Sequence, residues 1–130
     1  MSTILLSIKP EYVSRILEGT KKYEFRRTLA QRSVSRILIY STAPIMKVVG
    51  EVEVIGTISL KTSPLWEMTK THAGISRANF RKYFSGCRLA HAYKLGQVTQ
   101  YEEGYPLARY GIEQAPQSFV YVDQEKVQKV

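Results

Sequence analysis

Residues 47–60, KVVGEVEVIGTISL, constrain the fold more than any other part of the chain. Branched apolar residues alternate with polar ones over much of this run, which is the pattern of a strand with one buried face. Gly50 and Gly56 interrupt the alternation, and glycines inside a strand often mark bulges or bends. We therefore predict one long, bent strand of the kind that small barrels use. Its expected core residues are Val48, Val52, Val54 and Ile58.

Shorter elements surround this strand, and proline, glycine and serine mark their boundaries. A helix is expected from Pro10 to Gly19, because proline suits the first turn and glycine the C-terminal cap. Two more short helices are expected, from Ser63 to Gly74 and from Ser76 to Gly86. Further strands are predicted at residues 3–8, 22–27, 36–40, 88–101 and 117–123. This succession predicts an α+β fold: a small, bent mixed sheet or partly closed barrel with short helices packed around it.

Length and composition limit the class of protein. A chain of 130 residues fits one domain with its own core, so we expect a single domain over residues 1–130. Cys87 is the only cysteine, which excludes an internal disulfide and favours a reducing, cytoplasmic location. No apolar stretch is long enough to span a bilayer, so no membrane partner is expected. His72 and His91 are isolated, and Glu51 and Glu53 have no third ligand nearby, so we expect neither a metal nor a cofactor.

Positive charge is concentrated in one part of the sequence. The chain carries a formal charge of +8, and seven basic residues between Arg15 and Arg36 face only Glu18 and Glu24. A basic face attracts polyanions, because each lysine or arginine set against a phosphate releases condensed counterions. The charge pattern therefore favours a nucleic-acid partner, with ordinary solvated surface as the alternative.

The segment SIKPEYVSRILEGTKKYEFRR resembles the ASCH family, a branch of the PUA-like superfold. The family pattern G-x-K-x-x-E-x-R is present as Gly19, Lys21, Glu24 and Arg26. The later segments YSTAP and APQSFVY, and the strand that contains Gly50, are also similar to bacterial ASCH proteins of the predicted-regulator type. The resemblance spans nearly the whole chain. It implies a PUA-like β-barrel of five or six strands, with a cleft lined by this motif and an association with RNA.

Alternation along the strand distinguishes the motif residues. Glu24 and Arg26 share a strand face two residues apart, close enough for an ion pair, whereas Lys21 falls in the preceding turn and its direction is open. On a solvated surface such a pair contributes about 0.5 kcal/mol. If the face lines a cleft, Lys21 and Arg26 would bind phosphate or a base edge, and Glu24 would accept from a base amino group or orient the lysine.

The family that this segment resembles includes two kinds of enzyme. One ASCH branch hydrolyses N4-acetylcytidine with a lysine, a threonine nucleophile and a carboxylate. Lys21 matches that lysine, but Glu24 stands at the threonine position, and a carboxylate cannot replace a hydroxyl nucleophile in this step. Other ASCH-like proteins are described as ribonucleases acting on single strands. For RNA cleavage, a base, an acid and positive charge could come from Lys21, Glu24, Arg26, Tyr40 and Ser118.

Further residues are expected to contact RNA if the cleft is an RNA site. Arg27 is expected to attract phosphate, and Lys94 could add a charge from a neighbouring strand. Ser41 and Ser118 resemble positions that border the family's cleft. Tyrosines such as Tyr40 could stack on a base, which contributes about 1–3 kcal/mol per base, with a place in the core as the alternative.

These observations leave three functional hypotheses. The leading one is an RNA-binding domain that recognises single-stranded RNA or a modified nucleotide through Lys21, Glu24 and Arg26, as part of a transcription or translation regulator. The second is a small RNA-processing hydrolase in the same cleft, with Lys21 and Glu24 as catalytic residues: a ribonuclease or, less favoured, an N4-acetylcytidine amidohydrolase. The third is a protein-interaction module whose basic patch is only solvated.

Overall fold

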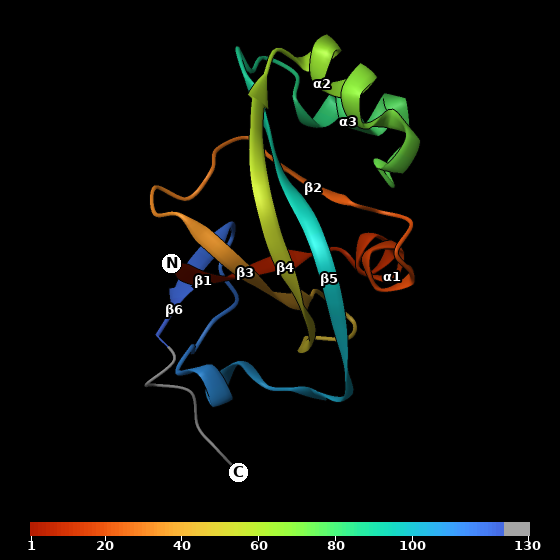
Figure 1. The fold of residues 1–130 in the computed structure, drawn as a ribbon. Coiled ribbons are helices and arrows are strands. Elements are labelled where there is room, and N and C mark those ends of the chain that lie inside the picture. The colour runs from red at the N-terminus through yellow and green to blue at the C-terminus, as the bar shows by residue number, and fades with distance from the viewer. Residues whose placement is uncertain (124–130) are drawn as a thin grey trace.

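A six-stranded sheet forms the centre of the computed structural model, which describes residues 1–123 (Figure 1). The strand order is β2-β5-β4-β3-β1-β6, with β1 and β3 parallel and the other neighbours antiparallel. The strands are β1 (Ser2–Ile8), β2 (Tyr23–Arg26), β3 (Val34–Ser41), β4 (Lys47–Leu60), β5 (Ala90–Tyr105) and β6 (Phe119–Val122). The predicted α+β class with a mixed sheet is confirmed. The sheet is open, because β2 and β6 lie at its two ends.

The long strands β4 and β5 give the sheet its bend. Their pairing is irregular between Val48 and Gly50, between Val52 and Val54, and between Val54 and Gly56. A side chain at Gly50 would place its Cβ 2.6 Å from the Thr99 carbonyl oxygen, so only glycine allows this approach. The predicted irregularities at the two glycines are therefore confirmed.

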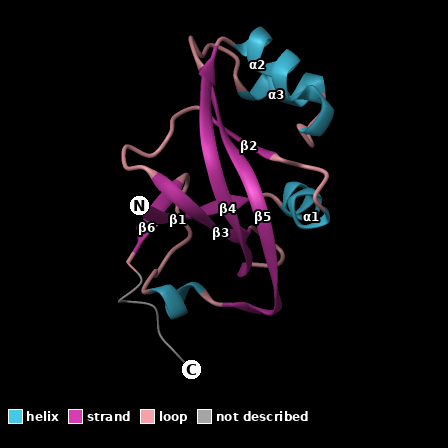
Figure 2. Cartoon of the chain, in the orientation of Figure 1, coloured by secondary structure: helices cyan, strands magenta, loops and turns pink. Residues whose placement is uncertain are grey.

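Three α-helices and two 3-10 turns connect the strands (Figure 2). Helix α1 begins at a proline and ends before Gly19, whose φ of 87° is the expected left-handed cap. Helix α2 begins one residue before the predicted Ser63, after Lys61, and has no side-chain cap. Ser76 caps α3 as predicted, accepting from the Asn79 amide at 3.0 Å. The bounds are α1 (Pro10–Glu18), α2 (Thr62–Thr69), η1 (Lys70–His72), α3 (Arg77–Tyr83) and η2 (Leu107–Tyr110).

Apolar side chains fill both faces of the sheet. On one face, Phe25 of β2 meets Phe80 and Phe84 edge-on, with ring centroids 5.0 and 6.2 Å away. On the other face, Tyr93 of β5 packs with the apolar side of α1 and with residues from β1 and β3. Strand β2 therefore separates an aromatic cluster under α2 and α3 from the main core.

The expected domain bounds and the expectation about membrane spans can be compared with the structure only over residues 1–123. The expected domain runs to Val130, and residues 124–130 lie outside the description, so its boundaries remain a prediction. Within residues 1–123, no helix combines the length and the apolar character that crossing a bilayer requires.

Candidate functional site

A cleft of about 680 Å³ lies beside β2, at the edge of the sheet. The end of β1, helix α1, the 19–22 turn, helix α3 and residues 117–118 form its walls. Five basic side chains line it against two carboxylates. The basic side chains belong to Lys9, Lys21, Arg26, Arg27 and Lys82, and the carboxylates to Glu11 and Glu24. The cleft therefore carries a positive excess that suits an anionic ligand.

Lys21 is the most buried charged residue of the cleft. Only 3% of its surface is exposed. Its Nζ donates to the Ala73 carbonyl oxygen at 2.7 Å, across 52 positions in the sequence. The same nitrogen lies 4.8 Å from the centre of the Phe25 ring and 5.3 Å from that of Tyr12. One carbonyl and two aromatic rings thus replace most of the water that an ammonium group normally binds.

Burial changes the acidity of this lysine. Loss of water lowers the pKa of Lys21 from its ordinary 10.5 to about 8, because the charged form is disfavoured in a dry site. The carboxylate of Glu24 opposes this shift, while Arg15 and Arg26 add to it. Lys21 can therefore exchange a proton near neutral pH, which an exposed lysine cannot do.

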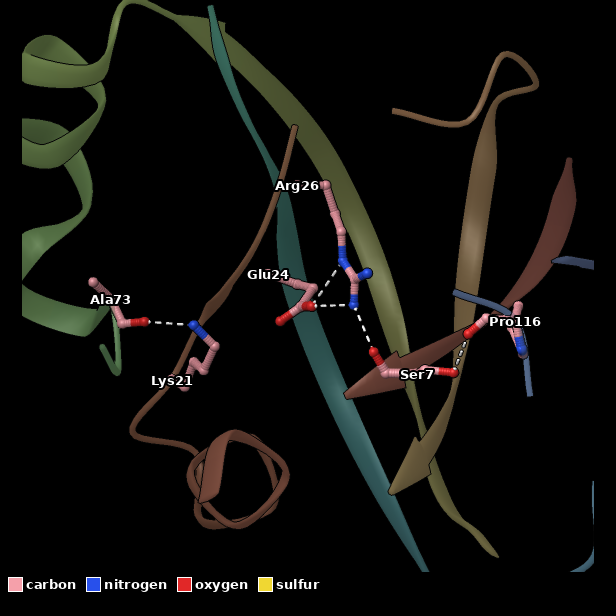
Figure 3. A network of polar contacts seen from close by, with 6 residues as sticks. All are labelled: Ser7, Lys21, Glu24, Arg26, Ala73 and Pro116. Carbon is pink, nitrogen blue, oxygen red and sulfur yellow. Dashed lines mark hydrogen bonds and ion pairs between the residues drawn. The ribbon is translucent and has the colours of Figure 1, made fainter. Parts of the chain in front are cut away.

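Glu24 and Arg26 form the predicted ion pair, and it is buried (Figure 3). The Arg26 guanidinium donates to Glu24 Oε2 from Nη2 at 2.7 Å and from Nε at 3.0 Å. Its Nη2 also donates to the Ser7 carbonyl oxygen of β1 at 3.0 Å. Three strands separate β2 from β1 in the sheet order, so Arg26 links two distant parts of the bent sheet. The Ser7 hydroxyl in turn donates to the Pro116 carbonyl oxygen at 2.7 Å.

Local sequence rules and one distant loop together position the motif. The αL cap at Gly19 turns the chain out of α1, and the Lys21 amide donates to the Arg15 carbonyl oxygen at 3.0 Å. Strand alternation then directs Glu24 and Arg26 to one face and Phe25 to the other. Gly74, in the loop before α3, has a φ of 64° and lies so close to the Lys21 stem that a Cβ there would overlap it.

Two aromatic residues, one on α1 and one on α3, and a basic residue that directly follows β2 belong to the cleft lining. The Arg27 guanidinium carbon lies 4.9 Å from the centre of the Tyr83 ring, and Arg27 Nε donates to the Tyr83 carbonyl oxygen at 2.9 Å. Burial raises the pKa of the Tyr83 and Tyr12 hydroxyls above the ordinary value of 10, so both rings stay neutral at physiological pH. Neutral rings in the lining of a basic cleft can stack on a nucleobase.

The structure brings five of the eight predicted site residues to this cleft. Those that line it are Lys21, Glu24, Arg26, Arg27 and Ser118.

The other three predicted residues lie away from the cleft lining. Tyr40 is 3% exposed and packs in a core cluster with Leu5 and Val48. Ser41 is buried at the end of β3, where it pairs with Ile8. Lys94 is exposed on β5, with its stem against Gly56. Tyr40 and Ser41 lie where they do because β3 pairs with β1. The resemblance to a family cleft does not specify this pairing.

Among the cleft residues that are absent from the predicted site, three from α1 and α3 bear on ligand binding. Tyr12 lies on α1, and Tyr83 is the last residue of α3. Asn79 lies on the same side of α3 as Tyr83, and its side-chain hydrogen bond with Tyr12 offsets part of the rise in the pKa of that hydroxyl. Aromatic residues at helical spacing usually mark a core face, so no local signal separates these from core residues. Within residues 1–123, no group of three or more His, Cys, Asp or Glu is arranged to hold a metal ion.

Known proteins resemble this chain over nearly its whole length. The sequence model of the ASCH domain matches residues 6–130. An ASCH domain-containing ribonuclease from Zymomonas mobilis is 28% identical over 136 residues, covering 97% of this chain and 88% of the relative. The crystal structure of ASCH from Zymomonas mobilis superposes with a TM-score of 0.88 at 27% identity, covering 96% and 90% of the two chains. A tyrosine-to-phenylalanine variant of that protein has a TM-score of 0.89 at 26% identity, covering 97% and 94%.

Two proteins of Ureaplasma parvum also match, but over a small part of their own length. ATP synthase subunit alpha is 26% identical and large ribosomal subunit protein uL22 is 27% identical, each over 121 residues. The matched region is 92% of this chain but 15% of the first protein and 39% of the second. The names of these two relatives therefore carry no function to this chain.

Proposed function

The chain belongs to the ASCH domain family, and from this premise we propose that it binds single-stranded RNA in the cleft beside β2 and cleaves it there. The observation that carries the proposal is Lys21: a lysine in a basic cleft, 3% exposed, with its pKa lowered to about 8. A group that exchanges protons near neutral pH is what general acid–base catalysis requires. The similar protein from Zymomonas mobilis, named a ribonuclease, supports the same direction.

The cleft residues fit the proton movements of RNA cleavage. The 2′ oxygen attacks phosphorus as its proton leaves, the bond from phosphorus to the 5′ oxygen breaks, and the 5′ oxygen takes up a proton. The products are a 2′,3′-cyclic phosphate and a 5′ hydroxyl. In the proposal, Glu24 accepts the first proton and Lys21 supplies the second, while Arg26 and Arg27 stabilise the charge that builds up on the phosphate.

Lys21→Met tests this proposal, because methionine keeps much of the stem and removes the proton. Wild type and variant are incubated with labelled single-stranded RNA, with EDTA and separately with Mg²⁺, and the products are analysed for cyclic phosphate ends. Loss of a proton donor is expected to slow cleavage about 10²–10⁴-fold. Wild-type cleavage should also decline as the pH rises through about 8, where Lys21 loses its proton.

Lys22→Met is the matched control. Lys22 is the next residue and its side chain is exposed, so this variant loses the same charge from outside the buried position. It should retain cleavage within a few-fold. Equal rates for wild type and Lys21→Met in a folded protein would disprove the role of Lys21. Cleavage that needs Mg²⁺ would disprove the proton-transfer scheme.

RNA binding without cleavage is the second candidate, and one observation favours it. Lys21 and Glu24 already have protein partners, in the Ala73 carbonyl oxygen and Arg26, so both groups could serve to shape a rigid recognition site. In that case wild type binds single-stranded RNA, binding weakens at raised salt and in the Lys21→Ala, Arg26→Ala double variant, and no product forms. A modified nucleotide as ligand, and a role in a transcription or translation regulator, belong with this candidate.

A further inference from the structure

We propose a second RNA-contacting site between α2 and α3, where Arg77 and Arg81 bind a backbone phosphate and Trp66 stacks on the adjoining base. The inference rests on the proposed RNA function of the cleft and extends it to the neighbouring part of the strand. A hollow of about 170 Å³ lies at this place. Both arginines, Trp66 and the hydroxyl residues Thr62 and Ser63 line it.

Helix α3 lies between the cleft and the hollow. Asn79 and Lys82 line the cleft, whereas Arg77 and Arg81 line the hollow. Each residue of an α-helix advances about 100° around the axis, so the two pairs project from opposite sides of α3. A single strand that leaves the cleft over α3 therefore passes from one basic surface directly to another.

The charges of the hollow favour an anion. Ion pairs within the described residues 1–123 do not include Arg77 or Arg81. Glu67 is the carboxylate of the lining, and its Oε2 is paired with Lys70 Nζ at 2.7 Å. This hydrogen bond lowers the pKa of Glu67, with a smaller contribution from Arg77. The two guanidinium groups thus keep a net positive charge that a phosphate can neutralise.

An aromatic surface lies beside these charges. Trp66 is half-buried, and its ring centre is 5.1 Å from that of Phe80, which fixes the indole against the core. Proteins that bind single strands combine positive charge along the backbone with aromatic side chains on which the bases stack. The two arginines and Trp66 offer this combination. The hydroxyls of Thr62 and Ser63 can add hydrogen bonds to the phosphate oxygens.

The spacing predicts which RNAs use the hollow. A helix with its side chains is about 10–12 Å across, so a strand must cover that distance to reach from the cleft to Arg77 and Arg81. A dinucleotide in the cleft is too short to fill both places. An RNA of about ten nucleotides is long enough, and this lies within the span that single-strand-binding domains usually cover.

Trp66 makes the hollow directly observable, because it is the chain's only tryptophan. The probe is a 2′-O-methyl RNA of about ten nucleotides, which binds a single-strand site and cannot form the cyclic phosphate. Titration of wild type is expected to quench Trp66 fluorescence. The Arg77→Ala, Arg81→Ala double variant should bind about 10-fold more weakly, with the salt dependence of log K reduced by about 0.7 for each lost phosphate contact.

A double variant with the same charge change at the other end of the sheet is the control. Lys47 is the first residue of β4, whereas α2 begins just after the opposite end of that strand (Figure 1). Arg109 lies over the ring of Tyr105, the last residue of β5. Lys47→Ala, Arg109→Ala should change affinity and salt dependence less than about 2-fold. Arg77→Lys, Arg81→Lys should restore the salt dependence and only part of the affinity, because lysine keeps the charge but not the fork of donors.

The outcomes separate this inference from the proposed cleavage. Cleavage of a dinucleotide uses the cleft alone, so it should be unchanged in the Arg77→Ala, Arg81→Ala variant. If wild type cleaves RNA but the double variant binds the probe as tightly as wild type, the second site is disproved while the cleft proposal stands. If Trp66 is quenched and binding depends on both arginines, but no RNA is cleaved, the second site stands and cleavage is disproved.

Discussion

Two carboxylate–arginine pairs, one on β2 and one that joins β3 and β4, differ in burial and in surroundings. Glu24 and Arg26 are 9% and 12% exposed at the side chain and line the cleft. Glu51 and Arg36 are 28% and 49% exposed, and Glu51 also accepts from the Tyr101 hydroxyl at 3.0 Å. Their shortest N–O distances, 2.7 and 3.1 Å, are similar. Distance therefore does not distinguish the two pairs, whereas burial beside a cleft does, and this burial is what supports the role proposed for the first pair.

The buried pair also differs because a third charge accompanies it. Lys21 contributes a second buried cation next to Glu24. Withdrawing three charged groups from water opposes folding, and replacing such a group by apolar side chains is often neutral or stabilising. Their retention in a cleft supports the chemistry proposed there, while the Glu51 pair needs no function to explain it.

The largest expected difference between the two pairs is in stability after loss of the carboxylate charge. Glu24→Gln leaves two buried cations without a counter-charge and should lower the free energy of unfolding by about 3–5 kcal/mol. Glu51→Gln should lower it by no more than about 1 kcal/mol, because water reaches Arg36 and the amide oxygen can still accept from Tyr101. Urea unfolding of both variants measures the contrast. Equal losses would mean that burial does not distinguish the pairs.

The pH dependence of stability sharpens the contrast further. The pKa of Lys21 falls from 10.5 to about 8 on folding, so between these values the unfolded chain binds more protons than the folded one. Stability therefore rises with pH in this window, by up to roughly 3 kcal/mol from this group. Subtracting the urea-unfolding free energy of Lys21→Met from that of wild type isolates the effect. A difference that stays constant from pH 8 to 10.5 would contradict the burial of a charged Lys21.

Gly74→Ala is expected to disturb the cleft from outside it. The added methyl group overlaps the Lys21 stem at a position whose φ of 64° already disfavours alanine. Gly86→Ala is the control, because Gly86 has a φ of 81° and no neighbouring atom within 4 Å of the place that a Cβ would take. Gly74→Ala should be about 1–3 kcal/mol less stable than Gly86→Ala. It should also bind RNA less well, measured by anisotropy, whereas Gly86→Ala should bind normally.

Arg36→Gln should show the smallest effect. Its partner Glu51 remains solvated and hydrogen-bonded to Tyr101, so the loss in unfolding free energy should be about 0.5 kcal/mol. RNA affinity should fall only by the small amount that the loss of one distant charge causes. Anisotropy titrations at two salt concentrations would measure this. A loss of several kcal/mol would show that the two pairs are equally important to the fold.

Some parts of the cleft could be predicted from neighbouring residues alone. Pro10 and Gly19 define the ends of α1, since each has a backbone preference that acts within one turn. Alternation places Glu24 and Arg26 on one face of β2, and their ion pair follows from that spacing. The family pattern added Lys21 to the same group.

Other parts depend on contacts between segments far apart in the chain. One such feature is that the sheet stays open and does not close into a barrel. Irregular pairing of β4 with β5 sets its curvature, and no local sequence pattern predicts how far a bent sheet closes. Tyr40 is another: its place in the core follows from the pairing of β3 with β1 and β4. Tyr12 and Tyr83 reach the cleft because α1 and α3 are brought to the same edge.

The sequence by itself determined the succession of elements, the shared face of Glu24 and Arg26, and the positive charge around them, because these depend on residues within one or two turns. Only the tertiary structure decided that Lys21 is buried. Its ammonium group is held by the carbonyl oxygen of Ala73, 52 residues away, against the rings of Tyr12 and Phe25. A pKa depends on the water that distant segments exclude, and that exclusion exists only once the chain is folded.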